Sequence, residues 1–323
     1  MKRRIWWGTW VMLLTLLTGM SFASPASAEG LQEKIVYSKA VGDMGGREVF
    51  IANPDGTGEQ QLTQTPSLDE THNQADEPVL SPDGKKIAYV SDWNGGSYEI
   101  WVMNVDGSDK VQITHNGMRN VEPVWSPDGS KILFSSACMG TDFEHCSGGD
   151  TSSDLWVYDI NTNTFTNLTN TPDVYEESAD WSPDGTKIVY SAYWKPGQFA
   201  SNQWDLFIAN ADGTNPQPLM IDNKHEYHPK WTANDTIFFI RDDTVTSPNY
   251  QFGIYQFNLT TKTLSPLYSR NGWITRMAVN PNGNQIAFTS PSDGTYTMDL
   301  ANPSPVQVLP AGSAIGDWGY AKQ

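Results

Sequence analysis

The sequence Ser-Pro-Asp-Gly recurs along this chain at a nearly regular distance, and it constrains the fold more than any other feature. Complete copies begin at Ser81, Ser126 and Ser182, and eroded copies begin at Thr232 and Asn280. Successive copies are 45, 56, 50 and 48 residues apart. A period in this range is typical of repeat architectures, in which each repeat is one small supersecondary unit. The chain is therefore predicted to be an array of similar units.

Each repeat has the pattern of four β-strands. We call each copy of Ser-Pro-Asp-Gly a hinge. On both sides of it, β-branched and aromatic residues recur with a period of two, as Ile132 and Phe134 do, which is typical of two strands joined by a turn. A second strand pair follows, joined by a tight turn such as Asp106-Gly107. Four antiparallel strands are the content of one β-propeller blade. A single blade cannot bury both of its faces, so the blades must pack on one another around an axis.

The two ends of the chain predict a sixth blade besides the five that carry hinges. Residues 35–63 contain a second, a third and a fourth strand, but no first strand precedes them. Residues 314–320 supply it, because the sequence Ile-Gly-Asp-Trp that ends at Trp318 matches the sequence Ser-Ala-Asp-Trp that ends at Trp181 in a first strand. Sharing one blade between both ends would remove the exposed edges of an open array. The expected fold class is all-β, a six-bladed β-propeller of four-stranded antiparallel blades over residues 29–323.

The repeat resembles that of a known family. The motif Trp-Ser-Pro-Asp-Gly-x-x-Ile, with an Asn-x-Asp-Gly turn after the third strand, is similar to the β-propeller repeat of the TolB family. The resemblance covers essentially the whole chain after residue 28 and implies a six-bladed propeller. TolB itself carries an α/β domain before its propeller, and we expect none here. Similar repeats occur in oligogalacturonate lyases and ahead of the catalytic domain of prolyl-oligopeptidase relatives.

The first 28 residues have the pattern of a secretory signal peptide. A basic start, an apolar stretch and a final Ala-Ser-Ala predict cleavage before Glu29. A retained membrane anchor is the alternative, which the short and interrupted apolar stretch disfavours. Cleavage would remove three basic residues and take the formal net charge from −17 to −20. We therefore expect a periplasmic or secreted monomer without stable membrane insertion, and the charge disfavours nucleic acid as a partner.

Two cysteines, Cys138 and Cys146, lie in one segment that has the composition of a loop. In an exported chain, such a pair is expected to form a disulfide that closes a short loop. Zinc is the weaker interpretation, because no matching pair of histidines accompanies the cysteines.

The first strands of the blades predict a polar opening of the central channel. The residue directly before each Ser-Pro-Asp-Gly hinge, such as Trp125 or Trp181, is called the hinge flank. The residues three positions before the hinge flank should gather at one mouth of the channel, although they lie far apart in the sequence. Inward-facing carboxylates must bind a cation, pair with an arginine or share protons. Calcium is the natural cation for such oxygen ligands, and Glu77 and Glu122 are its candidates; a salt-bridged funnel without metal is the alternative. The candidate mouth residues are Glu77, Glu122, Ser178, His228, Arg276 and Ile315, with Glu177 beside them.

Loop aromatics form a second candidate surface. Trp93, Trp194 and Trp204 lie in segments expected to connect the second and third strands of their blades. Aromatic side chains on a loop-rich face suit sugar stacking or a protein hot spot. The alternative is that they pack beneath their own loops as small local cores.

These patterns favour binding over catalysis. The expected function is that of an exported, non-catalytic propeller that binds a protein or peptide at the funnel-shaped mouth, with cell-envelope proteins among the candidate partners. The alternative is a carbohydrate-active protein, either a glycan-binding module or a polysaccharide lyase, that uses the same face; a structural scaffold is the third. No Gly-x-Ser-x-Gly motif supports a serine hydrolase. Solvent-facing aromatics around the mouth would favour sugar, whereas an acidic, roomy funnel would favour a basic peptide.

Overall fold

The computed structural model describes residues 30–42, 46–64, 74–93, 96–137, 152–172, 174–194, 203–244 and 251–322. By its contacts, the chain divides into a short unit, Met1–Gly30, and a large unit, Leu31–Gln323, to which every strand belongs.

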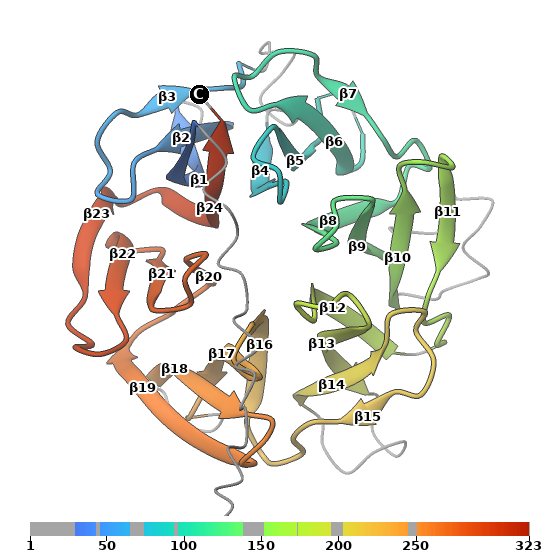
Figure 1. Ribbon diagram of the computed structural model, residues 1–323, viewed down its shortest axis with the longest axis vertical. Helices are drawn as coiled ribbons and strands as arrows, with labels where there is room; N and C mark the ends of the chain where they lie inside the picture. Colours follow the sequence, from blue (N-terminus) through green and yellow to red (C-terminus); the bar gives the residue numbers. More distant parts are fainter. Residues whose placement is uncertain are drawn as a thin grey trace, which may run out of the picture. The chain divides into compact units, whose positions relative to one another are not determined.

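The large unit is built from six four-stranded antiparallel blades, as the repeat predicts (Figure 1). A single parallel pair, Ser153 with Tyr175, joins blades 2 and 3 into one continuous sheet. Blade 1 comprises β4 (Ala75–Leu80), β5 (Lys86–Ser91), β6 (Glu99–Asn104) and β7 (Val111–Gln112); blade 2, β8 (Arg119–Trp125), β9 (Lys131–Ala137), β10 (Ser153–Asp159) and β11 (Thr164–Asn167); blade 3, β12 (Val174–Trp181), β13 (Lys187–Trp194), β14 (Trp204–Asn210) and β15 (Gln217–Pro218); blade 4, β16 (His225–Thr232), β17 (Thr236–Asp242), β18 (Gln251–Asn258) and β19 (Thr263–Asn271); blade 5, β20 (Arg276–Val279), β21 (Gln285–Ser290), β22 (Gly294–Asp299) and β23 (Val306–Pro310); blade 6, β24 (Ser313–Lys322), β1 (Leu31–Val41), β2 (Gly46–Ala52) and β3 (Gln60–Gln61).

The ring closes through the sixth blade, which combines both ends of the unit. Strand β24 pairs antiparallel with β1 along its length, from Leu31 opposite Lys322 to Lys39 opposite Ser313. The inner strands β4, β8, β12, β16, β20 and β24 contact one another in that order, and β24 contacts β4. The predicted closure is therefore confirmed, and the paired strands extend a few residues beyond the segments expected from the sequence.

The hydrophobic core lies mainly between neighbouring blades, because each blade must cover a face of the next. One cluster joins Val36 and Ile51 of blade 6 to Ile87 and Met103 of blade 1. Burying one such side chain contributes about 1.5–3 kcal/mol, so the packing between blades is a main source of stability. The repeated aromatic of every second strand is at most 2% exposed: Tyr37, Tyr89, Phe134, Tyr190, Phe239 and Phe288.

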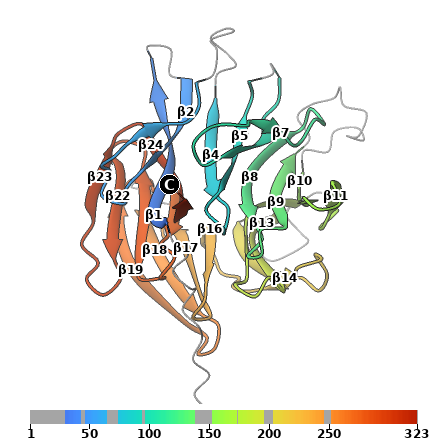
Figure 2. The same ribbon diagram turned by 45° about the horizontal axis from the view of Figure 1, so that its top comes forward.

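The hinge sequence is explained by the turn it makes between the first and second strands. In blade 2 the Ser126 hydroxyl donates to the Asp128 carboxylate at 2.6 Å and accepts from the backbone N–H of Lys131 at 2.9 Å. Gly129 has φ +71°, a left-handed conformation that other residues rarely adopt. Because the hinges share one end of the inner strands, we call that end the hinge face and the opposite end the mouth face (Figure 2).

Two sequence predictions fall outside the described residues. Cys138 and Cys146 are not among them, so their disulfide stays a prediction, and so does the signal peptide of residues 1–28. Within the part of the chain that is described, no helix is long and apolar enough to cross a membrane.

Candidate ligand-binding face

The inner strands bend where they enter the channel at the mouth face. In blade 2, Glu122 and Pro123 together oppose the single residue Phe134, which makes a β-bulge. A proline is tolerated there because a bulge leaves one residue out of the hydrogen-bond ladder. Four of the six candidate mouth residues have a positive φ angle, which is uncommon outside glycine. They are Glu77 (54°), Glu122 (55°), Ser178 (55°) and His228 (49°).

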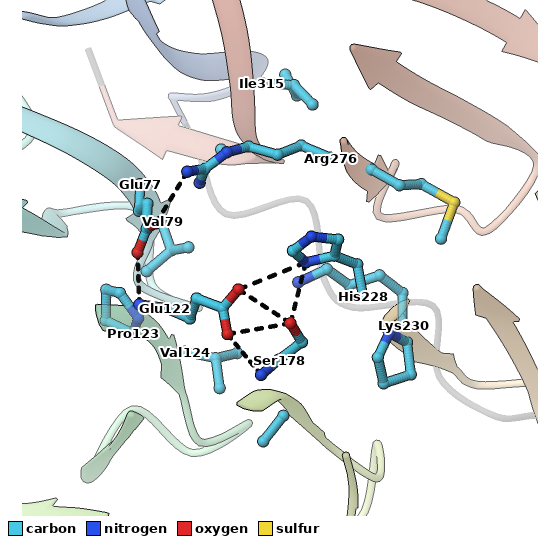
Figure 3. A pocket seen from close by; sticks show the side chains of 14 residues that line it. Glu77, Val79, Glu122, Pro123, Val124, Ser178, His228, Lys230, Arg276 and Ile315 are labelled. Carbon is cyan, nitrogen blue, oxygen red and sulfur yellow. Dashed lines mark hydrogen bonds and ion pairs between the residues drawn. The ribbon is translucent and has the colours of Figure 1, made fainter. Parts of the chain in front are cut away.

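These side chains bond to one another around the opening (Figure 3). Arg276 donates to Glu77 Oε1 at 2.8 Å, and Glu77 Oε2 accepts from the backbone N–H of Glu122 at 2.5 Å. Glu122 in turn accepts from the backbone N–H of Ser178 at 2.5 Å and from its hydroxyl at 2.9 Å. Ser178 Oγ lies 3.2 Å from His228 Nδ1. We call these five residues the mouth relay; each contact joins one blade to another.

The arginine of the mouth relay balances a pair of carboxylates. Arg276 lies 3.8 Å from Asp76 Oδ2, and Arg47 lies 3.0 Å from the same oxygen. Burial acts against ionisation of Asp76, yet the two arginines hold its pKa below the usual value. Burial raises the pKa of Glu77 despite Arg276, with Glu122 adding repulsion. The mouth side chains thus pair with one another, as in the salt-bridged funnel that the sequence left open beside a cation site.

His228 is neutral in this setting. Burial, and then the positive charges of Arg276 and Lys230, lower its pKa to about 3. Since Ser178 donates its one hydroxyl proton to Glu122, the hydrogen bond with His228 requires that Nδ1 carry the imidazole proton. A serine nucleophile needs the opposite arrangement, with an imidazole nitrogen accepting the hydroxyl proton. The contact therefore orders the mouth rather than activating Ser178.

The cavity among the mouth residues is small. It encloses about 50 Å³, room for one or two water molecules. Pockets that bury a small-molecule ligand are typically about 300–1,000 Å³. A sugar ring does not fit between these side chains as they stand, so the roomy funnel considered from the sequence is absent.

The mouth residues do not fit a calcium ion either. Glu77 and Glu122 already accept bonds from Arg276, Ser178 and the backbone, and the Arg276 guanidinium, 2.8 Å from Glu77 Oε1, would repel a cation bound to that carboxylate. Within the described ranges, no group of three or more His, Cys, Asp or Glu side chains is placed to hold a metal ion.

Glu177 lies beside the relay, and its side chain keeps 28% exposure. Its carboxylate lies 3.5 Å from the guanidinium of Arg119. Burial, and then the neighbouring Glu122, raise its pKa to about 7. Of the carboxylates predicted at the mouth, Glu177 keeps the most exposure, which makes it the one best placed to meet a ligand.

A row of aromatic rings runs from blade 3 to blade 4 at the mouth face. Tyr175 and Tyr193 are direct cross-strand neighbours with ring centroids 6.1 Å apart, and Tyr193 and Trp204 follow at 5.8 Å. Trp204 then contacts Tyr227 at 6.3 Å, and Tyr227 stacks on His225 at 5.8 Å. All five side chains are half-buried. We call these residues the aromatic row; it ends next to His228 in the chain.

Three members of the aromatic row, Tyr175, Tyr193 and Trp204, form a cross-strand set that the other blades do not repeat. The same three cross-strand positions can be compared in all six blades from the strand registers. Only blade 3 has three aromatics there: Gln74, Asp92 and Tyr98 in blade 1; Arg119, Ala137 and Ser153 in blade 2; Tyr175, Tyr193 and Trp204 in blade 3; His225, Asp242 and Phe252 in blade 4; Trp273, Pro291 and Asp293 in blade 5; Gly312, Ala40 and Arg47 in blade 6.

The three predicted loop tryptophans do not form one surface. Trp204 belongs to the aromatic row of blade 3, whereas Trp93 lies in blade 1 and stacks on Trp101 with centroids 5.6 Å apart. The side chain of Trp194 lies outside what the structure describes. Sequence reasoning missed Tyr175 and Tyr227 as partners of Trp204; aligning the repeats at the bulge, rather than at the hinge alone, would have found them.

A buried acidic cluster lies under the row in blade 4. Glu226 is fully buried, and its carboxylate lies 3.5 Å from Arg241, which also bonds Asp222 at 2.5 Å. Among the described residues neither Glu226 oxygen accepts a hydrogen bond. Burial, and then the Asp222 charge, raise the pKa of Glu226 to about 9. At neutral pH this carboxyl is therefore protonated.

Replacing Glu226 with glutamine should flatten the pH dependence of stability. A carboxyl whose folded pKa lies above its unfolded value of 4.5 makes the protein less stable as pH rises between the two. We expect Glu226→Gln to match the parent near pH 5 and to exceed it by about 1–3 kcal/mol at pH 9. Urea unfolding across this range measures the effect, with the exposed Asp293→Asn as control; parallel curves for parent and Glu226→Gln would show that Glu226 ionises normally.

Together, the repeat, the blades and the closed ring define a TolB-like β-propeller. The family model described as TolB beta propeller domain matches residues 14–144. A TolB from Acinetobacter baumannii superposes with a TM-score of 0.65 at 17% identity, covering 88% of this chain and 67% of that one.

Two other solved structures share the fold. An oligogalacturonate lyase in complex with manganese has a TM-score of 0.55 at 14% identity, over 86% of this chain and 74% of that chain. A chain of a nidogen/laminin complex has a TM-score of 0.64 at 10% identity, over 89% and 98%. No curated protein sequence matches. Identities this low show a common architecture and leave function to the site.

Proposed function

We propose that this propeller is an exported, non-catalytic protein that binds a protein or peptide segment across its mouth face. The observation that carries the proposal is the aromatic row. No other blade repeats its three rings from blade 3, and its member Tyr227 directly precedes His228 of the mouth relay in the chain. Half-buried Trp and Tyr side chains are the residue types most often found at binding hot spots. A propeller that needed these rings only for packing would repeat them in its other blades.

The charge around the row indicates a basic segment. Glu177 lies at the edge of the mouth, and Asp222 and Asp243 flank Arg241 in blade 4. The chain as a whole has a formal net charge of −17. Arginine and lysine side chains can lie over aromatic rings while their charges meet carboxylates, which gives about 0.5–2 kcal/mol per cation–π contact. A peptide with arginine or lysine between apolar residues therefore suits this face.

The likeness to TolB and to a chain of the nidogen/laminin complex supports a protein ligand and an extracytoplasmic location. The first 28 residues, with their signal-peptide pattern, support the same location. A partner in the cell envelope or outside the cell follows from both.

A carbohydrate-active protein is the second candidate, and the same aromatic row favours it, because rings also stack on sugars. The lyase likeness is a likeness of fold. The mouth, with about 50 Å³ of space, gives no room for a sugar in reach of His228. The second candidate function is therefore glycan binding along the aromatic row, and not glycan cleavage in the channel.

Selection of short random peptides displayed on phage tests the proposal. The best peptide is synthesised and its affinity measured by calorimetry for the parent, Trp204→Ala and Glu177→Gln. We expect basic peptides, an affinity loss of about 10-fold or more for Trp204→Ala, and a smaller loss for Glu177→Gln, because loss of a hot spot costs about 2 kcal/mol or more. Trp204→Phe, which keeps a ring in the row, should lose less.

The matched control is Asp83→Asn with Asp128→Asn on the hinge face, which should leave the affinity unchanged. Glu77 and Glu122 are unsuitable targets, because they hold the mouth relay together. Failure to select any peptide, or equal losses on both faces, would overturn the proposal. If cellotriose or triacetylchitotriose binds the parent and Trp204→Ala abolishes that binding while no peptide is selected, the glycan alternative replaces it.

A further inference from the structure

A second concave site lies away from the mouth, between blade 6 and blade 1. It encloses about 370 Å³, within the range of pockets that hold small ligands. Its walls come from the end of β3 and the segment after it, from β5, and from the turn before β7, in two sheets that are neighbours in Figure 1. The residues that line this Trp93 cleft are Gln61, Leu62, Thr63, Gln64, Tyr89, Ser91, Trp93 and Lys110.

A rigid aromatic platform forms one wall of the Trp93 cleft. Trp93 stacks on Trp101 with centroids 5.6 Å apart and an interplanar angle of 28°, and Trp101 stacks on Tyr89 at 6.4 Å and 30°. Tyr89 and Trp101 belong to the hydrophobic core, whereas Trp93 is half-buried and packs on it from outside. A ring held from behind by two others meets a ligand with little loss of conformational freedom.

The polar lining of the cleft surrounds this platform with hydrogen-bonding groups. The Gln61 amide donates to the backbone oxygen of Thr63 at 2.8 Å, which orders that side chain at the rim. Gln64 is exposed at the rim, and Lys110 brings an ammonium group. None of the eight described residues that line the cleft is acidic, although the chain has 37 Asp and Glu against 20 Lys and Arg. The cleft thus differs in charge from the acidic surroundings of the aromatic row.

We propose that the Trp93 cleft binds a pyranose ring of an oligosaccharide. A sugar presents an apolar C–H face that stacks on an aromatic ring, and hydroxyls at its edge that need amide, hydroxyl and ammonium partners. The cleft supplies both within one small volume. A basic peptide suits the cleft less well, because Lys110 repels it and none of the eight described lining residues carries a negative charge. The inference does not depend on the peptide proposal, since the two sites lie on different blades and differ in charge.

Calorimetry with three trisaccharides tests the site: cellotriose, triacetylchitotriose and trigalacturonic acid. We expect at least one to bind with a Kd in the micromolar to millimolar range and Trp93→Ala to weaken it about 10-fold or more. Trp93→Tyr, which keeps a stacking ring, should lose less. Trigalacturonic acid in preference to the neutral sugars would show that Lys110 meets a carboxylate, and Lys110→Gln should then remove the preference.

Two controls keep the test informative. Because Trp93 packs on the core, its truncation could disturb the fold; Gln64→Ala removes only a rim group and should still weaken binding about 3-fold or more. Trp273→Ala, at a tryptophan that is 52% exposed and precedes blade 5, should leave the affinity unchanged. Binding of none of the three sugars, or binding that Trp93→Ala and Gln64→Ala leave intact, would overturn the site.

Discussion

Replacing Trp318 with alanine should lower the free energy of unfolding by about 3–5 kcal/mol, the usual cost of emptying a large buried aromatic site. Trp318 is 3% exposed and packs with Ile35, Tyr37 and Phe50 of blade 6. It also lies directly opposite Ile35 in the β24–β1 ladder that closes the ring. Its loss therefore weakens the strand pairing that joins the two ends of the propeller. Urea unfolding at constant pH measures the change.

Removing residues 313–323 should have a larger effect, because β1 would lose its partner strand and leave an open edge in the sixth blade. We expect this protein to be recovered mostly as aggregate, and a synthetic peptide of residues 313–323, added during refolding, to restore some folded protein. Val306→Ala, at a side chain that is 62% exposed, is the control and should change stability by less than about 0.5 kcal/mol, as surface substitutions usually do. A truncated chain that unfolds at the parent's urea midpoint would contradict closure through blade 6.

The fold could be predicted from the sequence because each blade repeats the same local physics. The hinge turn, the alternating strand pattern and the tight turns are each encoded in a short local segment. The hinge occurs in five blades, and these copies reinforce one another. The closure was predictable for the same reason. The sequence around Trp318 has the pattern of a first strand, but no second, third or fourth strand follows it in the chain. What the sequence does not encode locally is the distance between blades, so the size of the mouth could not be foreseen.

The sequence predicted which residues gather at the mouth, but it did not predict the bonds that they make there. Pseudo-sixfold symmetry placed Glu77, Glu122, His228 and Arg276 at one opening, and the structure brings them together. At the bulges, however, the Glu77 and Glu122 side chains bond to the backbone of the neighbouring blade. A left-handed bulge conformation depends on pairing with the second strand, which spacing alone does not reveal. These two carboxylates therefore bond one blade to the next, and their contact with a ligand stays a prediction.

Replacing Arg276 with methionine should destabilise the protein by about 2–3 kcal/mol at pH 8. The change leaves Glu77 without its counter-ion beside Asp76 and Glu122. A fully buried pair would cost more, but the Arg276 and Glu77 side chains keep 24% and 14% exposure to the channel. A methionine fills similar space, so the loss reports charge rather than packing.

The pH dependence of that loss distinguishes the relay from an ordinary surface pair. Without Arg276 the pKa of Glu77, already raised by burial, rises further, so the carboxyl takes up a proton in the folded state at higher pH. Because the folded variant then binds more protons than the unfolded chain, its stability falls as pH rises, and the loss should be smaller at pH 5 than at pH 8. Adding Glu77→Gln to Arg276→Met should recover more than half of the loss. Arg270→Met removes the partner of the more exposed Asp293 and should cost less than about 1 kcal/mol at either pH; an Arg276→Met effect no larger than this would mean that the mouth relay contributes nothing to holding the blades.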